Sequence, residues 1–315
     1  MDLLSDILSH LKLSGTLYFR TSFTSPWSIE VPSFENVSRF HFAHRGRCLI
    51  RVSSELAPVM LEQGDLIIIT RGAGHLIFSE PDAEMPSAHL DEVVAKSGFT
   101  GHGALVYGEP GSHHETQLIC GHFAFDEDAS HPLIDALPSH IHIKNYGHSA
   151  GSWMENTLRV IGSEAGQDLL GSDLIALKMS EIIYAQAIRS FLSESGRDQK
   201  GLAGFLDPQI ARALRAMHES PENRWTLEGL SRISGMSRTS LANRFSESLS
   251  VTPLAYLTQW RMQIARQKLV DSNDSMIDIA ESVGYQSEAA FSRVFKKQFG
   301  MAPAGYRRHK KSLQP

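Results

Sequence analysis

The spacing of apolar and polar positions divides this chain of 315 residues into two kinds of structure. From Leu17 to about Phe125, short apolar runs alternate with turns that contain Gly and Pro, which is typical of strands in a sandwich or barrel. After about residue 150, apolar residues recur at helical spacing to about Arg308. The pattern predicts an α+β protein of two domains, with a β-rich N-terminal half and an all-α C-terminal half.

Three apolar runs are the clearest predicted strands: Leu49–Val52, Leu66–Ile69 and Gln117–Cys120. The polar, Gly-containing residues 80–103 predict a long loop. Helical spacing in 153–161 and 169–192 predicts a helix pair, and the polar, Gly-rich residues that follow predict a linker. Asp207-Pro208 then predicts a helix start, with an N-cap followed by Pro. The predicted domain ranges are 1–150, 151–192 for a helical dimerisation segment, 193–206 for the linker and 207–308.

A fifty-residue pattern occurs twice between Leu227 and Tyr306, without a gap. The matched positions are Ser237 with Ser287, Leu241 with Phe291, Phe245 with Phe295, Pro253 with Pro303, and Tyr256 with Tyr306. Each copy predicts a short helix, a tight turn and a second helix that begins after the serine. A continuous helix, Leu257–Leu269, is predicted between the copies. Two such helix–turn–helix units could contact DNA about one helical turn apart, roughly 34 Å.

The second helix of each copy supplies the candidate DNA contacts. Apolar residues four positions apart predict a buried stripe, so the remaining side chains face outward. These offer guanidinium, hydroxyl, methyl and amide groups, which suit base edges in a major groove. In the first copy they are Arg238, Thr239, Ser240, Ala242 and Asn243. In the second they are Ser287, Glu288, Ala289, Ser292 and Arg293, with Lys296 and Lys297 suited to phosphates. The faces differ, which predicts a non-palindromic site.

Charge separates the two halves in the same way. Residues 207–315 hold 16 Lys and Arg against 10 Asp and Glu, whereas residues 1–206 hold 14 against 25. Only the C-terminal half is therefore electrostatically suited to a polyanion. Thirteen of the 15 histidines lie before residue 207. The histidine-rich, acidic half is expected to have a different chemistry.

The C-terminal half resembles a known family. The run "DIAESVGYQSEAAFSRVFKKQFGMAPAGYRR" (278–308) is similar to the signature of the AraC/XylS family of transcription regulators, and residues 252–269 resemble that family's linker helix. The resemblance covers about residues 207–308. It implies a double helix–turn–helix DNA-binding domain, promoter DNA and RNA polymerase as partners, and base-reading positions at Thr239, Ala242, Asn243, Glu288, Ala289 and Arg293.

The N-terminal half resembles cupin sensor domains. Residues 64–75, "GDLIIITRGAGH", look like the second cupin motif, with Thr70 where that motif usually has Pro. The resemblance implies a cupin-like β-barrel that senses a small molecule or mediates homodimerisation. Five aromatic residues could line a ligand pocket or belong to the core: Trp27, Phe40, Phe42, Phe78 and Phe123.

A metal site in this half is one of two open interpretations of its histidines. The cupin metal set is incomplete, because His41 and His44 are three residues apart and point to opposite faces of a strand. An alternative set is Cys120 and His122, which share a face, with His41 and His75 from facing strands. Cys/His ligands of this kind would suit zinc. The other interpretation is that these side chains are hydrogen-bonded core residues.

The function that the sequence favours is a DNA-binding transcription regulator that is not an enzyme. The alternative is a metal-dependent cupin enzyme fused to a DNA-binding module, and the incomplete metal set argues against it. No run of eighteen apolar residues is present, so no membrane span is expected. The N-terminus does not resemble a secretory signal, and two isolated cysteines fit a reducing cytoplasm.

Overall fold

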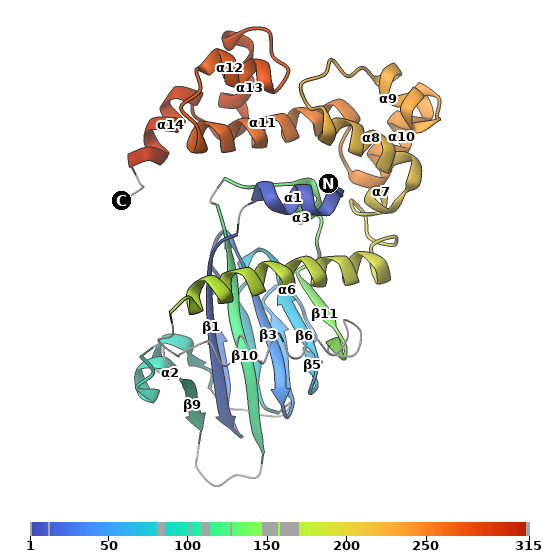
Figure 1. The fold of residues 1–315 in the computed structure, drawn as a ribbon. Helices are drawn as coiled ribbons and strands as arrows, with labels where there is room; N and C mark the ends of the chain where they lie inside the picture. Colours follow the sequence, from blue (N-terminus) through green and yellow to red (C-terminus); the bar gives the residue numbers. More distant parts are fainter. Residues whose placement is uncertain are drawn as a thin grey trace. The chain divides into compact units, whose positions relative to one another are not determined.

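The computed structural model describes residues 2–11, 13–80, 86–100, 103–108, 114–126, 128–146, 157 and 170–312. The chain forms two compact units, coloured along the sequence in Figure 1. Unit 1 comprises Met1–Lys12, Asp128–Ala136 and Leu192–Pro315, and unit 2 comprises Leu13–Glu127 and Leu137–Phe191. Two short N-terminal segments therefore belong to the C-terminal unit, which no local pattern in the sequence had indicated.

Unit 2 contains two sheets. The six-stranded sheet has the order β11-β6-β3-β10-β1-β9, and the five-stranded sheet has the order β5-β4-β7-β2-β8. All neighbouring strands are antiparallel except for the pairs β1–β9 and β2–β8. The strands are β1 (Leu13–Thr24), β2 (Ser28–Val31), β3 (Val37–Arg45), β4 (Cys48–Val52), β5 (Val59–Leu61), β6 (Leu66–Ile69), β7 (His75–Phe78), β8 (Ala88–His89), β9 (Ala104–Gly108), β10 (Glu115–Phe125) and β11 (His140–Ile143).

The six-stranded sheet is buried on both faces. Its inner face shares a core with the five-stranded sheet that includes Trp27, Ile67 and Ile69. Helix α6 (Ser172–Ser195) runs across its other face (Figure 1), where the ring of Tyr184 contacts Phe123. This double burial explains why β6 is apolar at every position, since a strand covered on both faces has no solvent side.

The turn after β6 requires the glycine of the cupin-like motif. A short 3-10 turn, η1 (Thr70–Gly72), leads to β7, and Gly72 has a φ of +62°. A Cβ atom at Gly72 would lie 1.7 Å from the carbonyl oxygen of Phe34, so no other residue fits. Thr70 is buried, and its hydroxyl donates a hydrogen bond to the carbonyl of Pro138. This threonine thus binds the backbone where the motif usually has proline.

Several expectations for this half are corrected or not confirmed. The three predicted strands are present as β4, β6 and β10, but residues 80–103 are not one loop, because α2 (Leu90–Ser97) buries Val93 and ends at the left-handed Gly98. The periodic segment was too short to stand out in its polar surroundings. The ladders of the described residues do not confirm a closed barrel. All of 153–161, the first helix of the predicted pair, lies outside those residues except for Thr157.

Unit 1 is all helical. Its helices are α1 (Leu3–Leu11), α3 (Pro132–Asp135), α7 (Ala203–Leu206), α8 (Pro208–Glu219), α9 (Leu227–Ser234), α10 (Arg238–Leu249), α11 (Pro253–Asp271), α12 (Met276–Ser282), α13 (Glu288–Phe299) and α14 (Pro303–Ser312). Figure 1 shows the long α11 running between the group α8–α10 and the group α12–α14. At ~1.5 Å per residue its 19 residues span about 28 Å.

The helix starts of unit 1 follow the predicted caps. Asp207 caps α8, Thr226 caps α9, and Ser237 and Ser287 cap α10 and α13 through their side-chain oxygens. Two separate cores result. The first contains Leu241, Phe245 and Tyr256, and the second contains Phe291, Phe295 and Tyr306. Each copy of the repeat is therefore a packed unit with its own core.

Two segments outside the repeat complete unit 1. Helix α1 packs against α8 and α11, and buries Ile7 and Leu11. Residues 193–206, the predicted linker, include the end of α6 and α7. Leu202 is fully buried, and a Cβ atom at Gly204 would lie 2.5 Å from Cγ of Leu249. Of the helices in the described ranges, none is both long and apolar enough to cross a bilayer.

Candidate nucleic-acid interface and internal cavity

Helix α10 presents a polar face over a buried apolar stripe. Leu241, Phe245 and Leu249 are buried, as the spacing predicted. Arg238, Thr239, Ser240 and Asn243 are exposed, and Ala242 is half-buried. Because the stripe fixes the rotation of the helix about its axis, these polar side chains share one solvent-facing surface.

Helix α13 presents a different set of side chains on the same framework. Phe291 and Phe295 are buried, and the rings of Phe295 and Phe299 lie 4.6 Å apart between centroids. Glu288, Ala289, Arg293, Lys296 and Lys297 are exposed, Ser292 is half-buried, and the exposed Ser287 uses its hydroxyl oxygen to cap the helix. The two faces therefore offer a DNA duplex unequal chemistry.

Several basic residues near these helices are held by protein partners. Arg244, which the sequence patterns did not single out, forms an ion pair of 2.5 Å with Asp207 and donates to Gln209, so it ties α10 to α8. Arg307 donates to the carbonyl of Leu269 at 3.1 Å, and Lys310 pairs with Asp128. The exposed Lys296 and Lys297 are thus better placed for phosphates than most of the C-terminal basic cluster.

In unit 2, polar side chains gather on the inner face of the six-stranded sheet. Strands β3 and β10 pair so that His41 lies opposite Cys120 and Arg39 lies opposite His122. The imidazole Nδ1 of His41 is 3.1 Å from Cys120 Sγ, and its Nε2 is 2.9 Å from Nε2 of His75 on β7. The four residues of the predicted metal site therefore lie close together. Arg39, which the sequence analysis did not name, belongs to the same group.

Burial favours the uncharged forms of the three histidines and of Cys120. Desolvation lowers the pKa of His75 to about 4, and desolvation together with the charges of His75 and Arg39 places the pKa of His41 well below its usual range. Burial also raises the pKa of the Cys120 thiol. The pKa of His122 is lowered by burial and by the nearby charge of Arg39.

This arrangement does not match a single metal centre. His41 uses one ring nitrogen for Cys120 and the other for His75, so the two partners lie on different sides of its ring. One ion cannot replace both contacts through a single nitrogen. Within the described residues, no group of three or more His, Cys, Asp or Glu side chains is arranged to hold a metal ion. The cluster fits the interpretation of hydrogen-bonded core residues, and zinc stays a prediction.

Beside this cluster lies a small cavity of about 80 Å³ that is partly open to solvent. Its walls are mainly apolar, and its polar lining comes from Arg39, His41, His122, Cys120 and Thr21. The apolar lining is Phe19, Phe23, Ile29, Val31, Ile77 and Leu90. None of the five aromatic residues that were candidates for a pocket lines it, and four of them (Trp27, Phe40, Phe42 and Phe123) are buried in the cores.

Among the described residues that line the cavity, Arg39 is the only cationic side chain with a fixed charge. It is half-buried and stacks at 4.5 Å on the ring of Phe34, and within the described part of the chain it makes no ion pair. Burial lowers the pKa of its guanidinium. A desolvated cation without a carboxylate beside it is a strong attractor for an anionic group.

Comparison with known proteins gave matches along most of the chain. The family described as "Cupin" matches residues 2–193, and the family described as "Helix-turn-helix domain" matches residues 230–309. A putative AraC-like transcription regulator of Streptomyces lividans is 31% identical over 98% of this chain and 99% of its own length. The HTH-type transcriptional regulator AlkR of Acinetobacter baylyi is 29% identical over the same shares.

One similar solved structure is the DNA-binding domain of AdpA in complex with a target DNA. It is 28% identical to this chain, covers 35% of it and 97% of its own length, and has a TM-score of 0.33.

The buried pair His41 and His75 should make unit 2 sensitive to acid. Unfolded histidine has a pKa of about 6.5, so below that pH the unfolded state binds more protons than the folded state and stability falls with pH. For His75, with a pKa near 4, the loss between pH 6.5 and pH 5 should approach about 2 kcal/mol. Thermal denaturation at both pH values should show a smaller loss for His75→Gln than for the wild type. The exposed His89→Gln is the control, and equal pH dependence in all three proteins would contradict the expectation.

Proposed function

Because this chain belongs to the family of AraC-like transcription regulators, with a cupin domain followed by a helix-turn-helix domain, we propose that α10 and α13 read two different DNA elements in adjacent major grooves. The observation that carries this proposal is the pair of capped helices with buried stripes and unequal polar faces. On α10, Arg238 provides a bidentate donor that suits a guanine edge, and Asn243 provides an amide that suits an adenine edge. Glu288 and Arg293 on α13 suit cytosine and guanine.

The proposed DNA site of one chain is therefore non-palindromic. Lys296 and Lys297 would add phosphate contacts that position α13 without reading sequence. Ala289 and the half-buried Ala242 have short side chains that carry no hydrogen-bonding group. They could therefore recognise a base only by apolar contact with a thymine methyl group. The protein would act on promoter DNA in the cytoplasm, with RNA polymerase as a further partner.

We further propose that the cavity of unit 2 binds a small effector with an anionic group and a compact apolar body. Arg39 supplies the positive charge, and the imidazole of His122 beside it adds a hydrogen-bonding group. Six apolar side chains make up the rest of the lining that this proposal uses. The cavity is small, about 80 Å³, and its mainly apolar walls with a few polar groups have the composition of small-molecule sites. To change DNA binding, such an effector must have unequal affinity for two states of the protein.

A third proposal concerns assembly. Helix α6 leaves large apolar side chains in solvent, although its opposite face is buried against the sheet: Leu174 is 61% exposed, Ile182 44% and Ile175 41%. Ile175 and Ile182 are seven residues apart and so lie on one side of the helix. A second copy of α6 would cover this face, which supports a homodimer through the segment predicted for that role.

Substitutions on the two reading faces test the DNA proposal. Duplexes that the full-length wild-type protein enriches from a random pool serve as probes. Arg238→Ala and Arg293→Ala should each weaken binding by about 1–3 kcal/mol and relax the preference at one position, whereas Lys297→Ala should weaken all duplexes alike and reduce the salt dependence. Fluorescence anisotropy at several salt concentrations measures these effects. Arg51→Ala, an exposed arginine on β4 of unit 2, is the control. Wild-type affinity in both α10 and α13 variants would contradict the proposal.

The effector proposal predicts a preference for acids over their neutral derivatives. Calorimetry of the full-length protein with aromatic and short aliphatic monocarboxylates, each paired with its methyl ester, should show tighter binding of at least one acid. Arg39→Gln should lose that preference, since a hydrogen bond to a charged group contributes about 1.5–3 kcal/mol. The control is Arg45→Gln, because Arg45 lies on the same strand but pairs with Glu115 at the surface. Equal binding of acids and esters would be evidence against an anionic effector.

The assembly proposal is tested by the mass of the protein in solution. Sedimentation of the wild type should give a dimer at micromolar concentration, and the double substitution Leu174→Glu with Ile182→Glu should give a monomer, because it places two charges in the proposed contact. Ile182→Leu keeps the face apolar and should stay dimeric. A wild-type monomer, or a dimer that survives the two glutamates, would refute this contact.

A further inference from the structure

The two copies of the repeat share a feature that DNA reading does not use. Tyr256 and Tyr306 occupy equivalent positions, fifty residues apart, and both are buried. The hydroxyl of a buried tyrosine requires a polar partner. In both copies a residue of one short segment provides it, namely Asp128 for Tyr306 and His131 for Tyr256. Asp128–His131, which we call the brace, lies outside the repeat and forms part of unit 1.

At the second copy, Asp128 is the centre of the contact. The hydroxyl of Tyr306 donates to Oδ2 of Asp128 at 2.7 Å, and the ammonium of Lys310 lies 3.1 Å from the same oxygen. The side-chain amide of Gln263 on α11 donates to the backbone carbonyl of Asp128 at 3.3 Å. Hydrogen bonds that involve a charged group are about twice as strong as neutral ones. The brace is therefore anchored to both α11 and α14.

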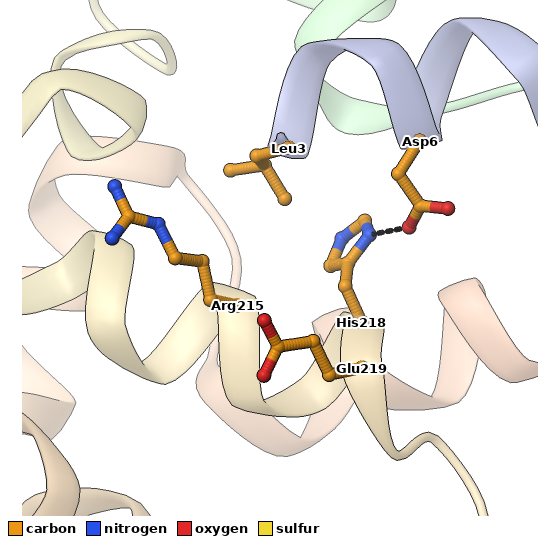
Figure 2. A pocket seen from close by; sticks show the side chains of 5 residues that line it. All are labelled: Leu3, Asp6, Arg215, His218 and Glu219. Carbon is orange, nitrogen blue, oxygen red and sulfur yellow. Dashed lines mark hydrogen bonds and ion pairs between the residues drawn. The ribbon is translucent and has the colours of Figure 1, made fainter. Parts of the chain in front are cut away.

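At the first copy, the hydrogen bonds form a chain with one consistent direction. Nδ1 of His131 accepts from the backbone N–H of Leu133 at 3.1 Å, so its proton is on Nε2, which is 2.9 Å from the hydroxyl of Tyr256. That hydroxyl can then donate to Nε2 of His218, at 2.7 Å. Nδ1 of His218 in turn donates to Asp6 on α1 at 2.6 Å, as Figure 2 shows for the Asp6 carboxylate and the imidazole of His218.

Ring contacts reinforce this chain. The imidazole of His131 meets the ring of Trp260 edge-on, with centroids 5.7 Å apart, and His218 stacks on the same indole at 4.1 Å. His131 is buried, so replacing it would leave the Tyr256 hydroxyl without one of its two partners. The first copy is thus also joined to the brace, through His131.

We propose that the brace fixes the separation and rotation of the two helix–turn–helix units by binding the same tyrosine in each. This rests on the proposed DNA function. Helix α11 alone connects the two units through the repeat, and the brace adds a second connection parallel to it. Two connections restrict bending and twisting between the units more than one does. The protein should therefore accept only a narrow range of spacings between its two DNA elements.

The brace also has a direct covalent route to the cavity. It lies in the connection between β10, which ends at Phe125, and β11, which begins at His140. Strand β10 lines the cavity through Cys120, Gly121 and His122, six residues before Asp128. A ligand that shifts the end of β10 would act on the brace, and through it on the spacing of the two reading helices.

DNA spacing provides the test. A duplex enriched by the full-length wild-type protein is compared with duplexes that carry one or two extra base pairs between its two elements. The wild type should bind the altered duplexes at least about tenfold more weakly. Tyr306→Phe, and the double variant Asp128→Ala with His131→Ala, should reduce this ratio to about threefold or less, while the affinity for a duplex with a single element stays the same.

The control is Ser130→Ala, an exposed brace residue that hydrogen-bonds to neither tyrosine, and it should keep the wild-type ratio. If the brace variants lose affinity equally for native and altered duplexes, α11 alone sets the spacing and the inference is overturned. Thermal denaturation of each variant shows whether a loss of affinity comes from unfolding. Tyr306→Phe should stay folded, because it keeps the aromatic ring in the core. If the wild type enriches no duplex at all, the DNA function itself fails, which is a distinguishable result.

Discussion

The burial of one aromatic and aliphatic stripe in each copy of the repeat is the constraint on which the surface proposed to face DNA depends. Phe245 and Phe295 are equivalent and fully buried, and each fixes how its helix is rotated. The exposed candidate contact residues of α10 and α13 could vary independently because the buried stripe does not include them. The same framework thereby carries two unequal surfaces. The tyrosine at the end of each core then supplies the polar group through which a segment outside the repeat is attached.

Local structure could be predicted closely from the sequence in the repeat. The signals there are the N-caps at Thr226, Ser237 and Ser287 and the four-residue spacing of apolar positions. They act within one or two turns of helix, so a short stretch of sequence is enough to detect them. Helix α2 was missed for the complementary reason. Its eight residues bury one side chain completely, Val93, and the flanking residues are polar. Propensity over so short a segment is weaker than the tertiary contact that stabilises it.

The long-range contacts could not be predicted in the same way. Asp128 and Tyr306 are 178 residues apart, and no periodicity connects them. A signal was nonetheless present, because a tyrosine repeated at a core position must have a partner for its hydroxyl. In the cavity, strand alternation predicted that Cys120 and His122 share a face, and both line the cavity. Arg39 lies two residues before His41 and so on the same face, but a charged residue in a strand is usually assigned to solvent.

The interleaving of the chain has a consequence for how this protein could exchange parts with others. Unit 1 is assembled from three stretches, of which two are encoded before and within the cupin half. A recombination event that joined a foreign cupin domain at residue 200 would bring its own first helix and its own β10–β11 connection to these tyrosines. Modular inheritance of the two halves is thereby limited, since a new cupin domain must also supply side chains for sites on unit 1.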